Sequence, residues 1–437
     1  MKHQNIQASI YNWGMKNYMD RIFDEKIIGY STVKKMLYRI VDTLQHAEKY
    51  KERGVSLPHG LLLTGMPGTG KSTLAECFLR ASGRASVIFR KDSEQNEFLD
   101  EMKKAFHDAA EKAPSVILLE DIHLFATGKY ASEWAALQSS IDECKDKNIF
   151  VVATANATEF IADSLLRPGR FDYIVEISLP MGATAKKIIA SYLDGQKLGD
   201  DINLEDISKV LSGSSCAALE SALNIAKVNA VYEGSEAIYK RHMVPALMEV
   251  IHKIRDTGKE YSEFEWRYIA MHETGHAIVC EALHPGQTAL VSILSDGNSV
   301  AGKTAYASSG YSTEQELMDL VTISLAGKAA VETLLGLFDL GAAEDIEWAA
   351  DKLNTWATRC AGGGFSSIEN LNESVSESSR KEHEDLVAVK LEELYQRAKK
   401  IVFENKEFAF RLCDELLAEE TGTLLSSDIT RICKAVR

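Results

Sequence analysis

The chain has 437 residues, of which 45% are hydrophobic and 26% are charged. These values exclude a mostly disordered or fibrous chain, and the length fits two to four domains. The formal net charge is −15. Residues 261–437 carry most of it, with 16 basic and 29 acidic side chains, whereas residues 1–260 carry 33 and 35. Because nucleic-acid binding requires a basic surface, we expect no nucleic-acid partner.

The seven cysteines are scattered, and no two are closer than twenty residues. Their number and spacing fit neither a disulfide framework nor a cysteine zinc site, which indicates reduced thiols and a cytoplasmic protein. The first twenty residues lack the apolar core of a signal peptide. No apolar run reaches the roughly 18 residues of a membrane span, so we expect none.

In chain order, residues 1–22 form a polar extension, and apolar residues recur at helical spacing over 31–53. Strands and helices then alternate, which predicts a parallel sheet covered by helices on both faces. The expected strands are 59–65, 86–89, 116–119, 149–153 and 173–178, and the expected helices between them are 74–81, 97–112 and 133–144.

The rest of the chain is predicted to be mostly helical. Residues 183–257 indicate a small helical domain that ends in a linker at 256–260. In the remaining part, from residue 262 to the end, the apolar, glycine-bearing segment 289–307 favours a short pair of strands. The polar run 366–384 is typical of a loop or the start of a helix.

A glycine-rich segment follows the first expected strand and opens a helix. It matches the pattern G-x-x-x-x-G-K-[ST] in the context that this motif requires. Its backbone N–H groups can cradle phosphate oxygens, Lys71 can reach the β and γ phosphates, and the Ser72 hydroxyl can ligate Mg²⁺. We therefore predict a nucleotide site formed by Gly65, Met66, Pro67, Gly68, Thr69, Gly70, Lys71, Ser72 and Thr73.

Polar residues follow three later features of the same sheet. Glu120 and Asp121 end one strand, where Glu120 can hold Mg²⁺ through water and Asp121 can orient the attacking water. Asn156 follows another strand and can position that water near the γ-phosphate. Arg167 and Arg170 flank a Pro-Gly turn, from which an arginine can reach the γ-phosphate on a neighbouring subunit.

The segment from His272 to His276 matches the pattern H-E-x-x-H. On a helix, residues i and i+4 lie on one face, so both imidazoles can bind one Zn²⁺. Glu273 can then accept a proton from the zinc-bound water. The pattern predicts a zinc hydrolase site.

A catalytic zinc needs a third protein ligand and an open fourth position. Downstream carboxylates supply the candidates, and spacing alone does not decide among them. Asp345 begins an expected helix over 345–360, from which its carboxylate can face the first helix. The candidates are Glu332, Asp339, Glu344 and Asp345.

Together these motifs resemble the FtsH family of ATP-dependent zinc metalloproteases, over about residues 23–437. Ile28 and Gly29 resemble the family's segment on the adenine side of the nucleotide. Residues 212–219 resemble its lid-helix motif, and residues 325–332 resemble its helix of small residues. The segment Gly341-Ala-Ala-Glu-Asp345-Ile resembles the one that carries the third zinc ligand, which favours Asp345.

The resemblance implies a fold class: an α/β P-loop ATPase domain with a helical lid, followed by a mostly α-helical zinc metallopeptidase domain. The corresponding limits are an extension at 1–22, an AAA core at 23–182, a lid at 183–257 and a protease domain at 258–437. It further implies Zn²⁺, ATP and Mg²⁺ as cofactors, polypeptide substrates and a homo-hexameric ring.

The chain departs from the family pattern in three ways. It lacks the usual N-terminal membrane segments, so it resembles a soluble member. The family's Asp-Glu pair is reversed as Glu120-Asp121, and the shorter Asp121 predicts slow ATP hydrolysis. An aromatic-plus-glycine translocation loop is not evident; residues 90–98 stand in its place, and neither Phe89 nor Phe98 can be assigned as the pore residue.

We therefore expect an ATP-dependent zinc metalloendopeptidase that degrades proteins, with ATP hydrolysis driving polypeptide delivery to the zinc. One alternative is a remodelling ATPase or chaperone whose zinc domain only binds peptide. A second alternative is an ATP-independent peptidase with a regulatory nucleotide site.

Overall fold

The computed structural model describes residues 22–91, 95–126, 128, 131–254, 261–294, 302–306, 313–360, 362 and 377–436. The chain divides into two compact units. The first unit runs to Asp194 and includes Gly213–Glu220, and the second comprises Gly195–Ser212 and Ser221–Arg437. The predicted extension, except residue 22, and the predicted linker at 256–260 lie outside the described residues.

A five-stranded parallel sheet forms the centre of the first unit, in the order β2-β3-β4-β1-β5. All five expected strands are present, with small differences in their ends. Because the strands are parallel, their carboxyl ends share one edge of the sheet. The bounds are β1 Gly60–Thr64, β2 Ala85–Arg90, β3 Ser115–Glu120, β4 Ile149–Ala155 and β5 Tyr173–Glu176.

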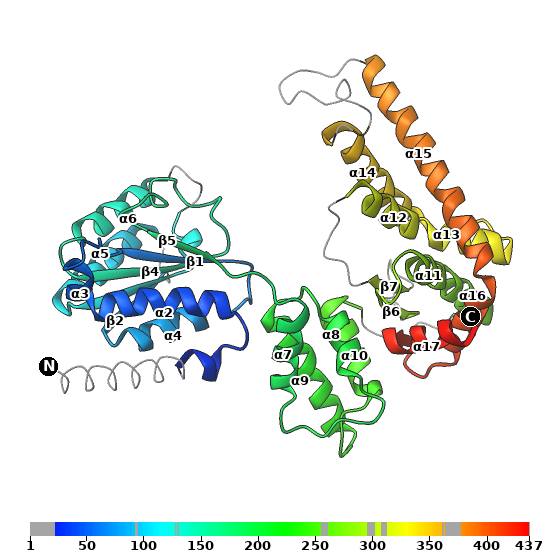
Figure 1. Cartoon of the computed structure of the whole chain (residues 1–437), viewed down its shortest axis with the longest axis horizontal. Coiled ribbons are helices and arrows are strands. Elements are labelled where there is room, and N and C mark those ends of the chain that lie inside the picture. The colour runs from blue at the N-terminus through cyan, green and yellow to red at the C-terminus, as the bar shows by residue number, and fades with distance from the viewer. Residues whose placement is uncertain are drawn as a thin grey trace. The chain divides into compact units, whose positions relative to one another are not determined.

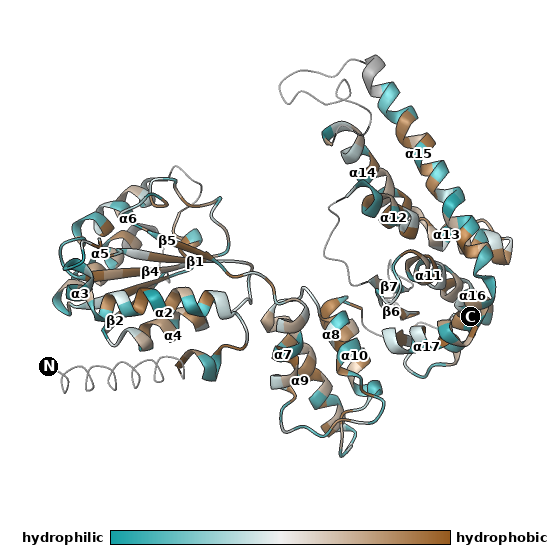
Figure 2. Cartoon of the chain, viewed as in Figure 1, coloured by the Kyte–Doolittle hydropathy of each residue, from teal (hydrophilic) through white to brown (hydrophobic). Residues whose placement is uncertain are grey.

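Helices cover both faces of this sheet, and the central strands β1 and β4 are hydrophobic along their length (Figures 1 and 2). Successive side chains of β1 point to opposite faces: Leu61 and Leu63 pack with α2 and α4, whereas Leu62 packs with α5 and α6. The first unit contains α2 Ser31–Gln45, α3 Ala47–Lys51, α4 Lys71–Ser82, α5 Gln95–Glu111, the 3₁₀ helix η1 Ile122–Leu124, α6 Ser132–Glu143 and α7 Gly182–Tyr192.

Beyond the sheet the chain is mostly helical, as expected, and most of these helices lie in the second unit. A capping box between Ser262 and Glu265 begins α11, whose side chains form the centre of the largest apolar cluster. The bounds are α8 Leu204–Val210, α9 Cys216–Tyr232, α10 Lys240–Ile251, α11 Glu263–Leu283, α12 Glu314–Ser324, α13 Ala326–Ala330, the π-helix η2 Val331–Leu335, α14 Ala343–Arg359, α15 Glu377–Glu404, α16 Lys406–Ala418 and α17 Ser426–Val436.

A small antiparallel sheet completes the second unit, in the order β7-β6-β8. The sequence predicts its first two strands, β6 Thr288–Ser292 and β7 Lys303–Tyr306, but not the third, β8 Thr423–Leu425. Among the described strands, β7 has a partner on one side only, so it forms an edge of the sheet. The predicted order of an α/β domain followed by a mostly helical domain is confirmed.

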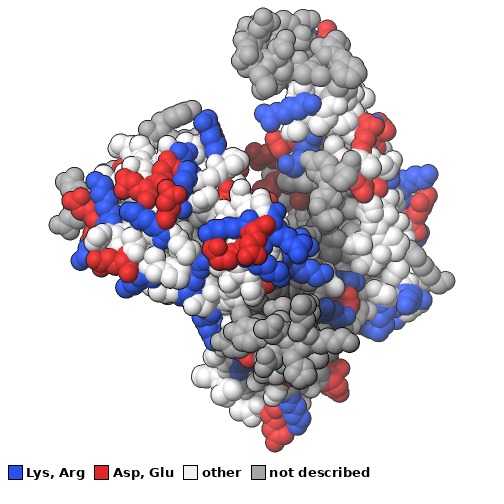
Figure 3. All heavy atoms as spheres, turned by 60° about the vertical axis from the view of Figure 1, so that its left-hand side comes forward, with Lys and Arg blue, Asp and Glu red and all other residues white. Residues whose placement is uncertain are grey.

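Two surface properties bear on partners. Within the described residues, no helix is both long and apolar enough to cross a membrane. Figure 3 shows acidic and basic side chains of the described residues interspersed over the visible face.

Candidate metal centre and phosphate site

Three side chains converge in a cleft of the second unit. His272 and His276 lie on one face of α11, and Asp345 lies in the first turn of α14. The Nε2 atoms of the histidines are 3.1 Å apart, and Oδ2 of Asp345 lies 3.2 Å from Nε2 of His272 and 3.3 Å from that of His276. Among the described residues, this is the one group of three or more side chains that can hold a metal ion.

The spacing of these atoms fits zinc. Ligand bonds of 2.0–2.1 Å in a tetrahedron place ligand atoms about 3.3 Å apart, which matches the three distances. Nδ1 of His276 lies 2.7 Å from the backbone oxygen of Ile323, so it donates there and Nε2 remains for a metal. Burial opposes ionisation of Asp345, yet its contacts with both histidines hold its pKa well below the usual range. The Asp345 carboxylate is therefore available as a ligand.

Asp339, one of the ligand candidates, lies on the other side of His272. Its Oδ2 is 2.7 Å from Nδ1 of His272, and its side chain is fully buried. Oδ1 accepts hydrogen bonds from the Tyr268 hydroxyl and, at 2.8 Å, from the backbone N–H of Gly341. Asp339 therefore orients the imidazole from behind and does not reach the metal position. Sequence spacing included this residue, but only as a possible ligand.

Two glycines allow the helices to meet at the cleft. A Cβ at Gly327 would lie 2.5 Å from Nε2 of His272 and 2.7 Å from Nε2 of His276. A Cβ at Gly275 would lie 2.4 Å from the backbone oxygen of Ala326. No side chain fits at these separations, so glycine at both positions lets α13 pack directly against the histidine face of α11.

Glu273 lies beside the histidines under the start of β7. The Thr304 hydroxyl donates toward Glu273, with Oε2 at 2.7 Å and the backbone oxygen at 2.9 Å. A Cβ at Gly302 would approach Oε1 of Glu273 to 2.7 Å. Strand β7 thus fixes the carboxylate of Glu273 at the wall of a cleft of about 640 Å³. The sequence does not predict the role of Thr304, because its contact with Glu273 depends on how β7 packs on α11.

The other two candidate ligands are placed elsewhere. Glu332 accepts a hydrogen bond from the Tyr395 hydroxyl and pairs with Lys328 at 2.7 Å and Lys399 at 3.1 Å. Glu344 lines the cleft and is exposed, but it is not part of the converging group.

The glycine-rich loop joins β1 to α4 in the first unit. Its glycines at 65, 68 and 70 have φ values of 145°, 77° and 92°, which side chains rarely adopt. Nζ of Lys71 lies 2.7 Å from the backbone oxygen of Gly65 and 3.1 Å from Oδ1 of Asn156. Burial lowers the pKa of Lys71, and the charge of Asp121 opposes that shift. The structure therefore places the loop, Lys71, Asn156 and Asp121 in one neighbourhood.

The predicted adenine-side segment also approaches the loop. Gly29 has a φ of 74°, and a Cβ there would lie 2.7 Å from Cγ2 of Thr184. The hydroxyl of the next residue, Tyr30, lies 3.7 Å from the Cys216 thiol. That thiol lies 3.8 Å from the backbone oxygen of Thr69. Tyr30, which follows Gly29, is thus linked to the loop through the Cys216 thiol.

Around the phosphate loop, several polar side chains are already paired. Glu120 pairs with Arg90, whose Nε and Nη2 lie 2.9 Å and 2.5 Å from its Oε2. Asn156 contacts His123 through Nδ2 and Nε2 at 2.8 Å. Asp121 has a left-handed backbone, with φ at 51°. No motif in the sequence predicts Arg90 or His123 at this site.

The two arginines around the Pro-Gly turn differ. Arg170 pairs with Asp142 at 2.8 Å and donates to the backbone oxygen of Ser164, so its own unit holds it. Hydrogen bonds from Arg170 lower the pKa of Asp142 to about 2. The side chain of Arg167 is exposed. Of the two, Arg170 is therefore the one held by an ion pair within its own unit, and Arg167 is the exposed one.

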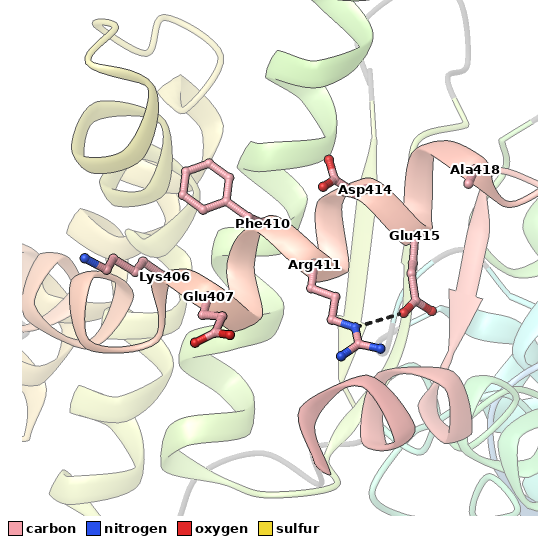
Figure 4. A pocket seen from close by; sticks show the side chains of 7 residues that line it. All are labelled: Lys406, Glu407, Phe410, Arg411, Asp414, Glu415 and Ala418. Atoms are coloured by element: carbon pink, nitrogen blue, oxygen red, sulfur yellow. Dashed lines mark hydrogen bonds and ion pairs between the residues drawn. The ribbon is translucent and has the colours of Figure 1, made fainter. Parts of the chain in front are cut away.

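A larger and more open hollow of about 840 Å³ lies along α16 (Figure 4). Arg411 pairs with Glu415 there at 3.4 Å. Figure 4 shows Phe410 and Asp414 on one side of the helix and Glu407 on the other. They do not converge on a point, so this hollow offers no catalytic arrangement.

Comparison with known proteins finds two family matches. Residues 61–179 match the ATPase family associated with various cellular activities (AAA), and residues 259–432 match peptidase family M41. The first match contains the glycine-rich loop, and the second contains the metal cleft.

Three similar proteins illustrate the relationship. The "ATP-dependent zinc metalloprotease FtsH" of Lachnoclostridium phytofermentans is 29% identical over 93% of this chain and 74% of its own length. "FtsH 2" of Sphaerobacter thermophilus is 30% identical over 74% of this chain and 52% of its own length. The protein named FtsH from Helicobacter pylori is 27% identical over 90% of this chain and 68% of its own length.

Proposed function

The chain combines an AAA ATPase domain with a peptidase family M41 domain, and from this premise we propose that it is an ATP-dependent zinc metalloendopeptidase. The resemblance to the FtsH family is thereby confirmed. The observation that carries the proposal is the convergence of His272, His276 and Asp345 beside Glu273. A purely structural zinc site has no need of a neighbouring base.

In the proposed reaction, His272, His276 and Asp345 would hold zinc, which would supply polarisation of the peptide carbonyl and activation of water. Glu273 accepts the proton of the attacking water on its carboxylate and returns it to the leaving amine. The Thr304 hydroxyl holds Oε2 of Glu273 in place. Asp339 keeps Nε2 of His272 directed into the cleft.

The edge strand β7 offers a way to hold substrate. Residues of β7 line the cleft, and among the described strands β7 is paired on one side only. An extended polypeptide can add to such an edge through backbone hydrogen bonds, with little dependence on its sequence. We propose that substrate pairs with β7 and so passes Glu273.

At the nucleotide site, we propose that residues 65–73 cradle the phosphates, with Ile28 and Gly29 on the adenine side. Lys71 would contact the β and γ phosphates, and the exposed Ser72 hydroxyl would ligate Mg²⁺. Asp121 and Asn156 would position the attacking water. ATP hydrolysis would then move polypeptide toward the zinc.

AAA family membership suggests oligomerisation, and we propose a homo-hexamer in which Arg167 acts on a neighbouring nucleotide. The exposure of Arg167 supports this role more strongly than the paired geometry of Arg170 does. All seven cysteines are free, which supports a cytoplasmic, reducing location.

Degradation of casein, with and without ATP, tests the proposal. We expect full-length chain loaded with zinc to degrade casein only while it hydrolyses ATP, and a non-hydrolysable analogue not to substitute. Equal cleavage without ATP would favour the peptidase with a regulatory nucleotide site. ATP hydrolysis without cleavage of casein or short peptides would favour the remodelling ATPase.

A further inference from the structure

The ion pair between Arg90 and Glu120 lies at the edge of the sheet that carries the phosphate loop. Arg90 ends β2 and Glu120 ends the neighbouring β3, where the two residues are register partners. Two guanidinium nitrogens approach one oxygen, Oε2, at 2.9 Å and 2.5 Å. The Glu120 side chain is only 10% exposed, whereas that of Arg90 is 58% exposed. The guanidinium thus approaches a largely buried carboxylate from the solvent side.

This pairing changes what Glu120 can offer a cation. The sequence predicts that Glu120 holds Mg²⁺ through water, which requires a carboxylate whose charge is not already balanced. A carboxylate beside a guanidinium attracts a second cation less, because the two positive charges repel each other. The exposed Ser72 hydroxyl remains free to ligate the metal, so the described residues fit Mg²⁺ only in part.

Asp121 is the acid next to Glu120, and its backbone and charge are placed as follows. Asp121 follows Glu120 in a left-handed conformation, and its backbone N–H donates to the Thr154 hydroxyl at 2.9 Å. Burial lowers the pKa of Lys71 and of His123, and the charge of Asp121 opposes both shifts. Asp121 therefore lies near enough to Lys71 for the two opposite charges to interact.

We propose that Arg90 competes with Mg²⁺ for Glu120, so that this chain binds nucleotide with an affinity that depends only weakly on Mg²⁺. The inference rests on the proposed nucleotide site and concerns how that site balances charge. Arg90 is tethered to the adjacent strand, so it competes at a high effective concentration. Binding of Mg²⁺ to Glu120 has to displace the guanidinium first.

The test is the affinity of the full chain for a fluorescent ADP, measured at equilibrium in excess Mg²⁺ and in excess EDTA. For the native chain we expect the two dissociation constants to agree within about threefold. In Arg90→Met, which keeps much of the side-chain length but no charge, Mg²⁺ should strengthen binding by a further threefold to tenfold, roughly the strength of a partly exposed ion pair.

Arg80→Met is the matched control. Arg80 is an exposed arginine in the last turn of α4, about 13 Å along the helix from Lys71. The Arg80→Met substitution removes the same charge from the same unit. It should therefore reproduce the native ratio of the affinities measured with and without Mg²⁺. In the double variant Arg90→Met with Glu120→Gln, the gain from Mg²⁺ should disappear again, because the freed carboxylate is gone.

Three results would overturn the inference: a native chain whose affinity rises more than about threefold with Mg²⁺, an Arg90→Met variant with the native ratio, or a gain that survives Glu120→Gln. The first needs no variant, so the inference stays testable if Arg90→Met does not fold. A native chain that binds no nucleotide in either condition contradicts the proposed nucleotide site instead.

Discussion

The metal cleft and the phosphate loop differ in how their charged side chains are arranged. In the cleft, three ligand atoms from two helices face one point, and the groups behind them hold them there. At the loop, the polar side chains bind one another: Lys71 binds Asn156, and Glu120 binds Arg90. The cleft is therefore ready for a cation, whereas nucleotide and Mg²⁺ have to replace contacts that the chain makes with itself.

This difference has a physical origin in the elements. The histidines are one helical turn apart on a buried helix, so packing fixes their rings. The phosphate-site residues come from the ends of separate strands, where long side chains can turn toward each other. We therefore expect replacement of a zinc ligand to have the largest effect. Replacement of a residue that only positions a ligand, or of Arg90 beside the loop, should have graded effects.

The largest effect should come from the third ligand. Asp345→Asn removes the anionic ligand, so zinc affinity should fall on the order of 100-fold or more and proteolysis should disappear. Metal analysis and casein cleavage measure both effects. Glu344→Gln is the matched control, because this neighbouring acid lies outside the converging group. A full complement of zinc in the Asp345→Asn variant would show that another acid is the third ligand.

Asp339 should have the next largest effect. Asp339→Asn keeps the shape of the side chain but weakens its hydrogen bond with Nδ1 of His272. The affinity for zinc should therefore fall about 10–100-fold. Competition with a zinc chelator measures the change. At saturating zinc, proteolysis should largely return, because Asp339 orients a ligand and is not one. Failure of excess zinc to restore activity would contradict that role.

Thr304 tests how firmly Glu273 must be held. Thr304→Val removes the hydroxyl and keeps the volume, so we expect the turnover of a peptide substrate to fall about tenfold while zinc content stays the same. Thr304→Ser restores the donor and should recover most of the rate. Equal rates in the valine and serine variants would show that the hydroxyl does not position the base.

The smallest effect is expected from mixing chains. Lys71→Ala and Arg167→Ala should each lose ATPase activity, yet a 1:1 mixture should recover about a quarter of the native rate, the share of subunit interfaces that keep both groups. Replacing the second chain by the double variant Lys71→Ala with Arg167→Ala should abolish the recovery. A native chain that hydrolyses ATP as a monomer would contradict action between subunits.

Local patterns in the sequence predicted most of the fold. Alternating apolar runs identified all five strands of the parallel sheet, and helical spacing placed His272 and His276 together. Strand β8 was not predicted, because it is three residues long and pairs with β6, which lies more than a hundred residues away in the chain. Its identity depends on a distant partner and not on a local pattern.

The same limit applies to the sites. The motifs identified the residues that would contact zinc or phosphate. The residues that hold these side chains in position lie on other elements of the fold. The contact of Thr304 with Glu273 depends on how β7 packs on α11, and the pairing of Arg90 with Glu120 depends on strand register. The pairing of Arg170 with Asp142 likewise joins a turn to a helix. Such contacts become visible only when the packing is known.

The most direct test of the account compares the zinc content and proteolytic activity of the native chain and Glu273→Gln. Glu273 is a proposed base and not a ligand, so both proteins should hold one zinc per chain. With ATP present, the native chain should degrade casein, and the variant should be slower by a factor on the order of 10²–10⁴. Unchanged proteolysis in zinc-loaded Glu273→Gln would contradict the assignment of this cleft as the peptidase site.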